Sequence, residues 1–368
     1  MTGISDIIRR ARITGLSGAI ALCAVLGGSA QASDTPVAQL KTFKDWMVGC
    51  NNVRHCTAIG LSAAPSEAYV VVTRDGGAEA PAEIALIAPR EDPSERLEAP
   101  VVSLRIGGAP VAGLSKSDWP ADIDGSDAEG KSALLRLRGE DAAALLKAMR
   151  AGDALDVRTI DAKGQSQVRI SLSGATAAFL YMDEAQHRNG TVTALAASGP
   201  APASSIPAPP ALPRLEPVII RAVTHPPAAL PPGVTPPPAQ DCDGAPPPTV
   251  LQLGPHLQLW GVCEFANHHN FSARYWLVGP DGAREAALSV PGHPDEGGSP
   301  SVLINLSLSR DGRLLESFTR GRGVSDCGTR TGWVWTGTAF RLAYFSEMTD
   351  CRGVSADHWP SLYVTRQD

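Results

Sequence analysis

Charged side chains and two tryptophans gather near the C-terminal end of the chain in a pattern suited to binding a ligand. A glycine-rich stretch that contains arginines leads into a cysteine, and two tryptophans follow, two residues apart. Tryptophan rings bind sugars and proline-rich peptides, and guanidinium groups bind carboxylates and phosphates. The predicted binding residues are Arg320, Arg322, Asp326, Trp333 and Trp335, with Arg330 beside them.

The two tryptophans also have a second interpretation, in which both rings fill a core. Residues two apart on a strand share one face of the sheet, and large aromatic side chains are mostly buried. The nearby charges would then only pair with one another at the rim of the core.

The histidines and acidic residues lack the spacing of a metal site. His268 and His269 are adjacent, so on a strand they would point to opposite faces. The acidic run from Asp122 to Asp127, with Glu129 after it, has the alternating oxygens of a calcium loop but not its twelfth-position glutamate. We therefore expect no metal and no cofactor.

Catalytic motifs are also missing from the sequence. It contains no G-x-S-x-G, H-E-x-x-H or S-x-x-K. The carboxylate pair Asp183-Glu184 falls on a predicted helix, where adjacent side chains diverge by about 100°. We expect a protein without enzymatic activity. The alternative is an envelope hydrolase that acts on glycan or cell-wall substrates, with two carboxyl groups that meet only in the fold, about 5–9.5 Å apart.

The first 32 residues have the features of a secretory signal. Three arginines at positions 9, 10 and 12 precede the apolar run Ile13–Leu26, and Ala30-Gln31-Ala32 forms a small-x-small cleavage site. The run is shorter than the roughly 18–20 residues that span a bilayer, and no later segment is long enough. The sequence predicts a periplasmic protein cleaved after Ala32, with no transmembrane segment in the mature chain.

The charge of the chain argues against nucleic acid as a partner. The formal net charge is −6, and removal of the basic signal makes it more negative. Binding to phosphate backbones requires a basic surface.

Six cysteines remain once Cys23, inside the signal, is set aside. An even number of cysteines in an exported chain predicts disulfide bonds. Neighbouring cysteines in the sequence flank turn-like dipeptides, which favours three local pairs. These pairs are Cys50 with Cys56, Cys242 with Cys263, and Cys327 with Cys351.

A proline-rich stretch divides the chain. Seventeen of the 31 prolines lie between Pro200 and Pro248, and such a stretch favours an extended linker. The predicted organisation is a signal at 1–32, a first domain at 33–195, a linker at 196–240 and a second domain at 241–368. The apolar fragment Val218–Val223 inside the linker favours a strand against one domain's edge.

The first domain is predicted to be β-rich α+β, with two helices. We expect helices over Glu140–Arg150 and over Ala175–Arg188, the second capped by Ser173 and ended by Gly190. The expected strands are Tyr69–Arg74, Glu83–Ala88, Val101–Ile106, Ala133–Arg138, Ala154–Ile160 and Gln167–Leu172.

The second domain is predicted to be all-β and antiparallel, as a meander or a sandwich. Alternating apolar residues from Val302 to Leu308 are typical of a strand with one buried face. The expected strands are Leu257–Cys263, Ala273–Val278, Arg284–Val290, Val302–Leu308, Leu314–Arg320, Gly332–Trp335 and Ala339–Ser346.

Several separate stretches resemble a proteobacterial periplasmic family that is catalogued only as a domain of unknown function, numbered eleven seventy-six. They are Phe43–Cys50 with Cys56 shortly after, Met182–Arg188, Gly321–Gly328, Trp333–Gly337 and Cys351–Gly353. The first domain is also similar to the invasion-associated locus B proteins, which share an F-x-D-W start. The resemblance implies a periplasmic β-rich module tied to envelope integrity or host contact. The family has no assigned reaction, so no catalytic residue is carried over.

Together these features predict an exported, non-catalytic binding or envelope-accessory protein. The expected partner is an envelope protein, a peptide or a glycan, whose identity the sequence does not specify.

Overall fold

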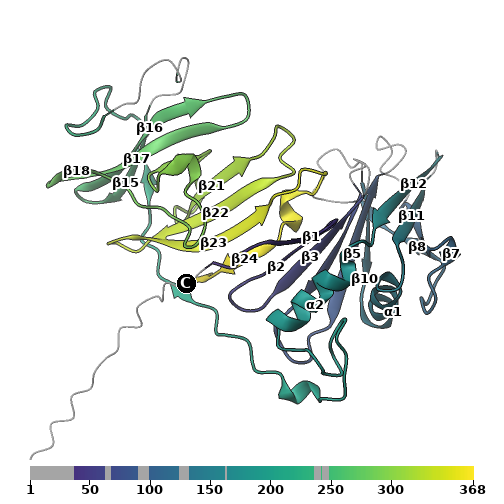
Figure 1. Ribbon diagram of the computed structural model, residues 1–368. Helices are drawn as coiled ribbons and strands as arrows, with labels where there is room; N and C mark the ends of the chain where they lie inside the picture. The colour runs from purple at the N-terminus through teal and green to yellow at the C-terminus, as the bar shows by residue number, and fades with distance from the viewer. Residues whose placement is uncertain are drawn as a thin grey trace, which may run out of the picture. The chain divides into compact units, whose positions relative to one another are not determined.

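Figure 1 shows the chain as a computed structural model, which describes residues 37–62, 68–89, 99–123, 132–161, 164–235, 242 and 248–368. The predicted signal, its cleavage site after Ala32 and the acidic run beyond Ile123 lie outside the described residues.

Seven antiparallel strands form the first sheet, in the order β1-β2-β3-β4-β5-β10-β9. Alternate residues of β2 and β3 face opposite sides, and all of them are buried. One side packs on a helix and the other on a segment near the C-terminus. The strands are β1 (Lys41–Phe43), β2 (Trp46–Cys50), β3 (Cys56–Leu61), β4 (Tyr69–Arg74), β5 (Ala82–Pro89), β9 (Asp122–Ile123) and β10 (Ser132–Leu137).

A second antiparallel sheet and two helices complete this region (Figure 1). The sheet has the order β12-β11-β6-β7, and β8 also pairs with β6. Its strands are β6 (Val101–Ile106), β7 (Ala109–Pro110), β8 (Asp118–Pro120), β11 (Ala154–Asp161) and β12 (Gly164–Ser171), and the helices are α1 (Gly139–Met149) and α2 (Ala175–Ala185). The predicted β-rich region with two helices is confirmed.

Trp46 is the central side chain of the first core. It is completely buried, its Nε1 donates to the Ser171 carbonyl at 2.9 Å, and its ring meets Phe179 of α2 edge-on at 5.4 Å. A Cβ atom at residue 60 would lie 2.4 Å from this ring. Gly60 therefore makes the room that lets β3 pass beside it.

The ends of α2 differ from the sequence prediction. Gly174, not Ser173, is the N-cap residue, with a φ of 105° and no side-chain cap. A Cβ atom there would lie 1.8 Å from the Phe43 carbonyl oxygen, so this close approach requires glycine. The helix ends at Ala185 with Gln186 as its C-cap, and His187 takes a left-handed φ of 57°, so the chain turns before Gly190.

The C-terminal region consists of two antiparallel sheets that share one apolar core. Leu259, Tyr275 and Leu277 come from one sheet, and Leu315, Trp333 and Trp335 from the other. The predicted all-β antiparallel region is confirmed, as a sandwich.

The strand order in the first of these sheets is β14-β15-β16-β17-β18 with β19 beside β17, and in the second β20-β21-β22-β23-β24. The strands are β14 (Arg221–Ala222), β15 (Thr249–Gly254), β16 (Leu257–Ala266), β17 (Phe271–Gly279), β18 (Gly282–Glu285), β19 (Val302–Ile304), β20 (Ser307–Leu308), β21 (Leu315–Arg320), β22 (Gly328–Trp335), β23 (Phe340–Met348) and β24 (Ser361–Val364). Short 3-10 turns lie at Ala203–Ser205, Glu296–Gly298 and Ala356–His358.

Two predicted strands of this region are shorter than expected. The strand over Val302–Leu308 is interrupted at Asn305, which has a φ of 50° and accepts the Phe271 N–H at 2.8 Å. The strand over Arg284–Val290 stops at Glu285. The chain then leaves the sheet as a loop, residues 286–301, which includes the buried Leu288.

The proline-rich stretch contacts the folded chain at several points. The Val218 N–H donates to the Trp335 carbonyl and the Ile220 N–H to the Gly312 carbonyl, both at 2.8 Å. β14 then pairs with β15, which confirms the strand expected within Val218–Val223. Further upstream, β13 (Arg214–Leu215) pairs in parallel with β25 (Arg366–Gln367).

The first sheet and the C-terminal region share an apolar cluster. Met47, Ile59 and Tyr69 pack in it with Val354 and Trp359. The described chain forms one compact unit. The proposed domain boundaries at 195/196 and 240/241 remain a prediction.

Three disulfides are present, and they have the local pairing: Cys50–Cys56, Cys242–Cys263 and Cys327–Cys351. Disulfides persist mainly in oxidising compartments, so they indicate an extracytoplasmic protein. Among the described residues, no helix is long and apolar enough to cross a membrane.

Candidate functional site

The two tryptophans of the predicted binding surface lie inside the sandwich. Trp333 is 2% exposed and Trp335 1% exposed, and both pack in the cluster between the two sheets. They share one face of β22, as residues two apart must, and that face is the inward one. Of the two interpretations of these tryptophans, the structure therefore has the one in which both rings fill the core, and they do not form an exposed platform.

Arg322 and Asp326 form an ion pair that supports the loop before the third disulfide. Arg322 Nε donates to Asp326 Oδ1 at 2.7 Å, and Arg322 Nη2 contacts Oδ2. Asp326 is 5% exposed and also accepts the Gly353 N–H at 2.7 Å. Burial acts to raise the pKa of Asp326, but the bonds from Arg322 and Gly353 outweigh it and hold that pKa below its ordinary value.

The other two predicted cations differ: Arg320 Nε is buried without a hydrogen-bond partner among the described residues, whereas Arg330 is paired. The Arg320 backbone N–H donates to Asn270, and the Arg320 guanidinium lies 5.5 Å from the Phe318 ring centre. Arg330 pairs with Asp357 at 3.3 Å. The structure thus brings Arg322 and Asp326 together but does not assemble the five predicted residues into one surface.

A buried polar network closes the end of α2. Asp183 is completely buried and accepts the backbone N–H groups of Leu195, Ala196 and Ala197 at 2.7–3.1 Å. Arg188, also completely buried, donates to the carbonyls of Ala78 and Gly77. Glu184 is exposed, so the adjacent carboxylates diverge as the helical spacing predicts.

A histidine near the first disulfide lies between two oxygen-bearing side chains. His55 Nδ1 is 2.7 Å from Asp75 Oδ1, and His55 Nε2 is 3.5 Å from Thr57 Oγ1. Thr57 is only 5% exposed, and it lines neither of the two pockets described below. A nucleophile needs access to its substrate, so this order of side chains does not form a usable acyl-transfer site.

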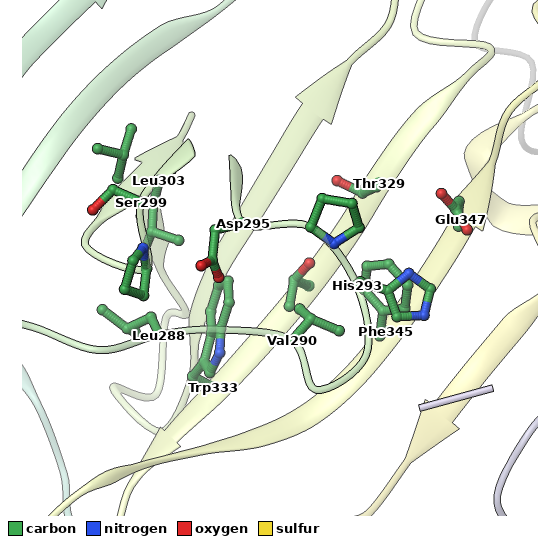
Figure 2. A pocket seen from close by; sticks show the side chains of 14 residues that line it. Leu288, Val290, His293, Asp295, Ser299, Leu303, Thr329, Trp333, Phe345 and Glu347 are labelled. Carbon is green, nitrogen blue, oxygen red and sulfur yellow. The ribbon is translucent and has the colours of Figure 1, made fainter. Parts of the chain in front are cut away.

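The best-formed candidate site is an apolar pocket between the 286–301 loop and strands β22 and β23 (Figure 2). Its cavity volume is about 70 Å³, smaller than the roughly 300–1,000 Å³ of sites for drug-sized ligands. Most of its wall is apolar. The apolar lining residues are Leu288, Val290, Pro294, Pro300, Val302, Leu303, Trp333 and Phe345.

Two polar atoms in the lining residues are buried without a hydrogen-bond partner. Trp333 Nε1 has no acceptor and Asp295 Oδ1 has no donor among the described residues. An unsatisfied buried polar group costs about 1–3 kcal/mol, and native structures contain few of them. The residues that line the pocket therefore include one buried donor and one buried acceptor without a partner among the described residues.

The far end of the pocket has a second carboxylate. Figure 2 shows Glu347 beyond His293 and Phe345, well apart from Asp295. Burial raises the pKa of Glu347, and the nearby His293 acts in the opposite direction. Because the two carboxylates lie at different ends, the pocket does not present them as an acid–base pair.

Residues 37–39 form hydrogen bonds with the pocket loop at residues 291–293. His293 Nε2 lies 3.0 Å from the Ala38 carbonyl oxygen, Gln39 Nε2 donates to the Gly292 carbonyl at 2.8 Å, and the Val37 N–H donates to Pro291. The His293 ring also packs 4.6 Å from the Phe345 ring. The loop is thus fixed by residues from both ends of the chain.

Sequence reasoning found only part of this site. It selected Trp333, either as a binding ring or as a core residue, but not as part of this pocket. Asp295 and Glu347 were not selected, because they come from a loop and a strand that lie about fifty residues apart in the sequence. The visible signal was the run of proline, histidine, aspartate and glycine between residues 291 and 300, which predicts a loop but not what it covers. The described residues contain no group of three or more side chains able to hold a metal.

The family model described as "Protein of unknown function (DUF1176)" matches residues 40–366. The chain belongs to this family. The stretches that carried the resemblance in the sequence include Trp46, Asp183, Arg188 and Asp326, all of which support the fold. Trp333 is the member of those stretches that also lines the pocket.

Two other proteins are similar to this chain. The uncharacterized protein YpfG of Escherichia coli K12 is 28% identical over 366 residues, which cover 89% of this chain and 93% of that protein. The crystal structure of invasion associated protein B from Bartonella henselae covers 40% of this chain and 99% of its own, with 17% identity and a TM-score of 0.29.

Proposed function

We propose that this protein is a non-catalytic binding protein of the periplasm, and that its ligand occupies the pocket beneath the 286–301 loop. The observation that carries the proposal is the pair of buried, unpartnered atoms, Trp333 Nε1 and Asp295 Oδ1, in the lining of an apolar pocket. A ligand with one acceptor and one donor would satisfy both groups. It would also remove the cost of leaving them unpaired.

The walls of the pocket favour a small, mainly apolar molecule. Leucine, valine, proline and aromatic side chains form most of the surface, and burial of apolar area supplies about 25 cal/mol per Å². An extended glycan needs open aromatic platforms, and the tryptophans here are buried. Of the predicted partners, a peptide that inserts one apolar group fits this pocket best, and a small amphipathic molecule, which was not predicted, would fit it as well.

A binding role is better supported than a hydrolytic one. Hydrolysis of glycosidic bonds uses two carboxyl groups that flank the reacting bond, whereas Asp295 and Glu347 lie at different ends of the pocket (Figure 2). Burial by itself raises the pKa of a carboxyl group, so the raised pKa of Glu347 does not require a catalytic role.

Export to the periplasm is supported by two features. The first 32 residues have the pattern of a cleavable signal, and the three disulfides suit an oxidising compartment. Intact-mass analysis of the protein purified from the periplasm should show a chain that begins at Ser33. A full-length chain found only in the cytoplasm would contradict export.

The binding proposal can be tested by filling the pocket. A panel of small amphipathic molecules, beginning with indole and medium-chain alcohols, is screened by ligand-detected NMR against the mature protein and two variants. Val290→Trp places a large ring in the pocket, whereas Val324→Trp makes the same change at an exposed position, 73% accessible. We expect probes to bind the wild type and Val324→Trp but not Val290→Trp. Equal binding to all three proteins would show that the probes bind elsewhere and would overturn the proposal.

A further inference from the structure

A second cavity lies in the first region, at the side of α1. The end of β4, the start of β5, one face of α1 and the loop 192–198 enclose about 950 Å³, including the part open to solvent. It is lined by different residues from the apolar pocket and does not depend on that pocket's function.

The charged residues that line this cavity are all positive. Of the described residues that line it, three are cationic and none is acidic: Arg74, Lys147 and Arg150. Lys147 and Arg150 belong to the last turn of α1 and its C-cap and are exposed. Arg150 Nη1 donates to the Leu195 carbonyl at 3.1 Å, so it is held at the cavity wall.

Arg74 is the unusual member of this group. It is only 5% exposed, and its Nε donates to the Ala80 carbonyl at 3.0 Å. Its Nη1, however, is buried and has no acceptor among the described residues. A buried guanidinium with a free donor is costly unless an acceptor reaches it.

No carboxylate among the described residues supplies that acceptor. Asp183 attracts Arg74 through space, and its oxygens accept three backbone N–H groups. Arg188 nearby adds another positive charge, and burial followed by repulsion from Arg188 lowers the pKa of Arg74 to about 10. Arg74 is therefore still charged at neutral pH and has a vacant donor.

We propose that this cavity, the Arg74 cavity, binds the oxyanion group of a small molecule, a phosphate or a carboxylate. Guanidinium forks match the geometry of both groups. Arg74 would supply the buried hydrogen bond, and Lys147 and Arg150 would supply the charge at the entrance. This site lies on the first region and is separate from the pocket at Trp333.

The test uses inorganic phosphate and acetate as probes on the mature protein, each compared with sodium chloride at equal ionic strength and pH. Binding is measured by thermal shift and by titration calorimetry. We expect saturable stabilisation by at least one oxyanion, beyond the effect of chloride. Phosphate alone would identify a phosphate site, and acetate alone a carboxylate site. No saturable effect of either would overturn the proposal.

Matched variants locate the effect. Lys147→Glu puts an acid at the cavity entrance, and Lys41→Glu makes the same change of charge at an exposed position on β1. Both positions are on the surface, so both variants should fold. We expect Lys147→Glu to weaken oxyanion binding at least tenfold and Lys41→Glu to leave it within twofold. Equal weakening in both variants would show a general charge effect and would refute the site.

A third variant separates the two sites of the molecule. Val290→Trp fills the apolar pocket and should leave oxyanion binding unchanged. Loss of oxyanion binding in Val290→Trp would place the anion in the apolar pocket and would contradict the assignment to the Arg74 cavity.

Discussion

The end of α2 and the pocket at Trp333 both bury polar side chains, but their hydrogen bonding differs. Near α2, Asp183 accepts three N–H groups and Arg188 donates to backbone carbonyls. At the pocket, Trp333 Nε1 and Asp295 Oδ1 have no partner among the described residues. In these two places the partnered groups hold the fold, and the unpartnered atoms belong to residues that line a pocket. Burial without a partner does not by itself mark a ligand site, because Trp119 Nε1, Trp276 Nε1 and Arg320 Nε are also unpartnered among the described residues and line neither pocket.

The same comparison separates neighbouring residues within one region. Arg188 is partnered at several positions, whereas Arg74 retains a vacant Nη1 beside a cavity. Both arginines are buried, so burial alone does not distinguish a structural charge from a binding charge. The two arginines differ in whether each guanidinium nitrogen has an acceptor.

The largest effect is expected for Asp183→Ala. The substitution leaves the N–H groups of three consecutive residues without an acceptor and removes the carboxylate near Arg188. We expect it to lower the free energy of unfolding by about 3–5 kcal/mol. Glu184→Ala, at the exposed neighbouring position, should change it by less than about 0.5 kcal/mol. Urea denaturation measures both values, and a small effect of Asp183→Ala would break the comparison.

The Arg322–Asp326 pair should have the next largest effect. Arg322→Ala leaves the buried Asp326 with the Gly353 N–H but without its guanidinium, so we expect a loss of about 1–3 kcal/mol. The exposed Arg341 provides the control, since Arg341→Ala should be close to neutral. A neutral Arg322→Ala would show instead that Arg322 is free to serve as a binding residue.

The pH dependence of that pair has a definite sign. Because the pKa of Asp326 is lowered in the folded state, its contribution is present above the ordinary aspartate pKa of about 3.9. It is lost as the pH falls through the lower, folded value. The stability difference between wild type and Asp326→Asn should therefore be constant near neutral pH and should shrink in acid. A difference that does not change with pH would contradict this account.

The sequence predicted some strands and missed others, and the burial pattern of each strand explains much of the difference. Val101–Ile106 was predicted with its observed bounds because one of its faces is more exposed. Tyr69–Arg74 is buried on both faces and was predicted from its run of β-branched residues. β2 and β3 were not predicted, since their residues are buried on both sides and show no alternation. The break at Asn305 was missed because the apolar pattern continues through a residue with a left-handed backbone.

The candidate site was harder to predict than the fold. The local disulfide pairs follow from short sequence separations, and β22 follows from its composition. The pocket instead joins a loop, two strands and an N-terminal segment, and no local pattern contains the information that these pieces meet. The accessibility of Trp333 also depends on which face of β22 is covered, which only the packing of the two sheets decides.

Two matched tryptophans allow the comparison to be tested on a single strand. Trp335 Nε1 donates to the Leu253 carbonyl at 3.1 Å, whereas Trp333 Nε1 has no partner, and both rings are buried. Replacing either with phenylalanine removes the N–H and leaves a similar small cavity. Without ligand, we expect Trp335→Phe to cost about 1 kcal/mol more than Trp333→Phe, the net value of one hydrogen bond. Equal costs in chemical denaturation would mean that the Trp333 N–H is satisfied.

Glu347→Gln should give the smallest effect and tests the far end of the pocket. Burial raises the pKa of Glu347 in the folded state, so the charged form is the disfavoured one. The protein is then most stable with respect to this group below the ordinary glutamate pKa of about 4.3, and it loses that advantage as the pH rises through the folded value.

Glutamine has the same shape as glutamate and no charge. The variant should match the wild type in acid and should be more stable at neutral pH, by less than about 1 kcal/mol because the side chain is partly solvated. Melting temperatures measured from pH 4 to 8 should be equal for the two proteins at pH 4. The melting temperature of the variant should exceed that of the wild type increasingly as the pH rises. Curves that stay parallel would mean that the Glu347 carboxylate is already stabilised by a partner at the pocket, and the pocket would then have one fewer group available for a ligand.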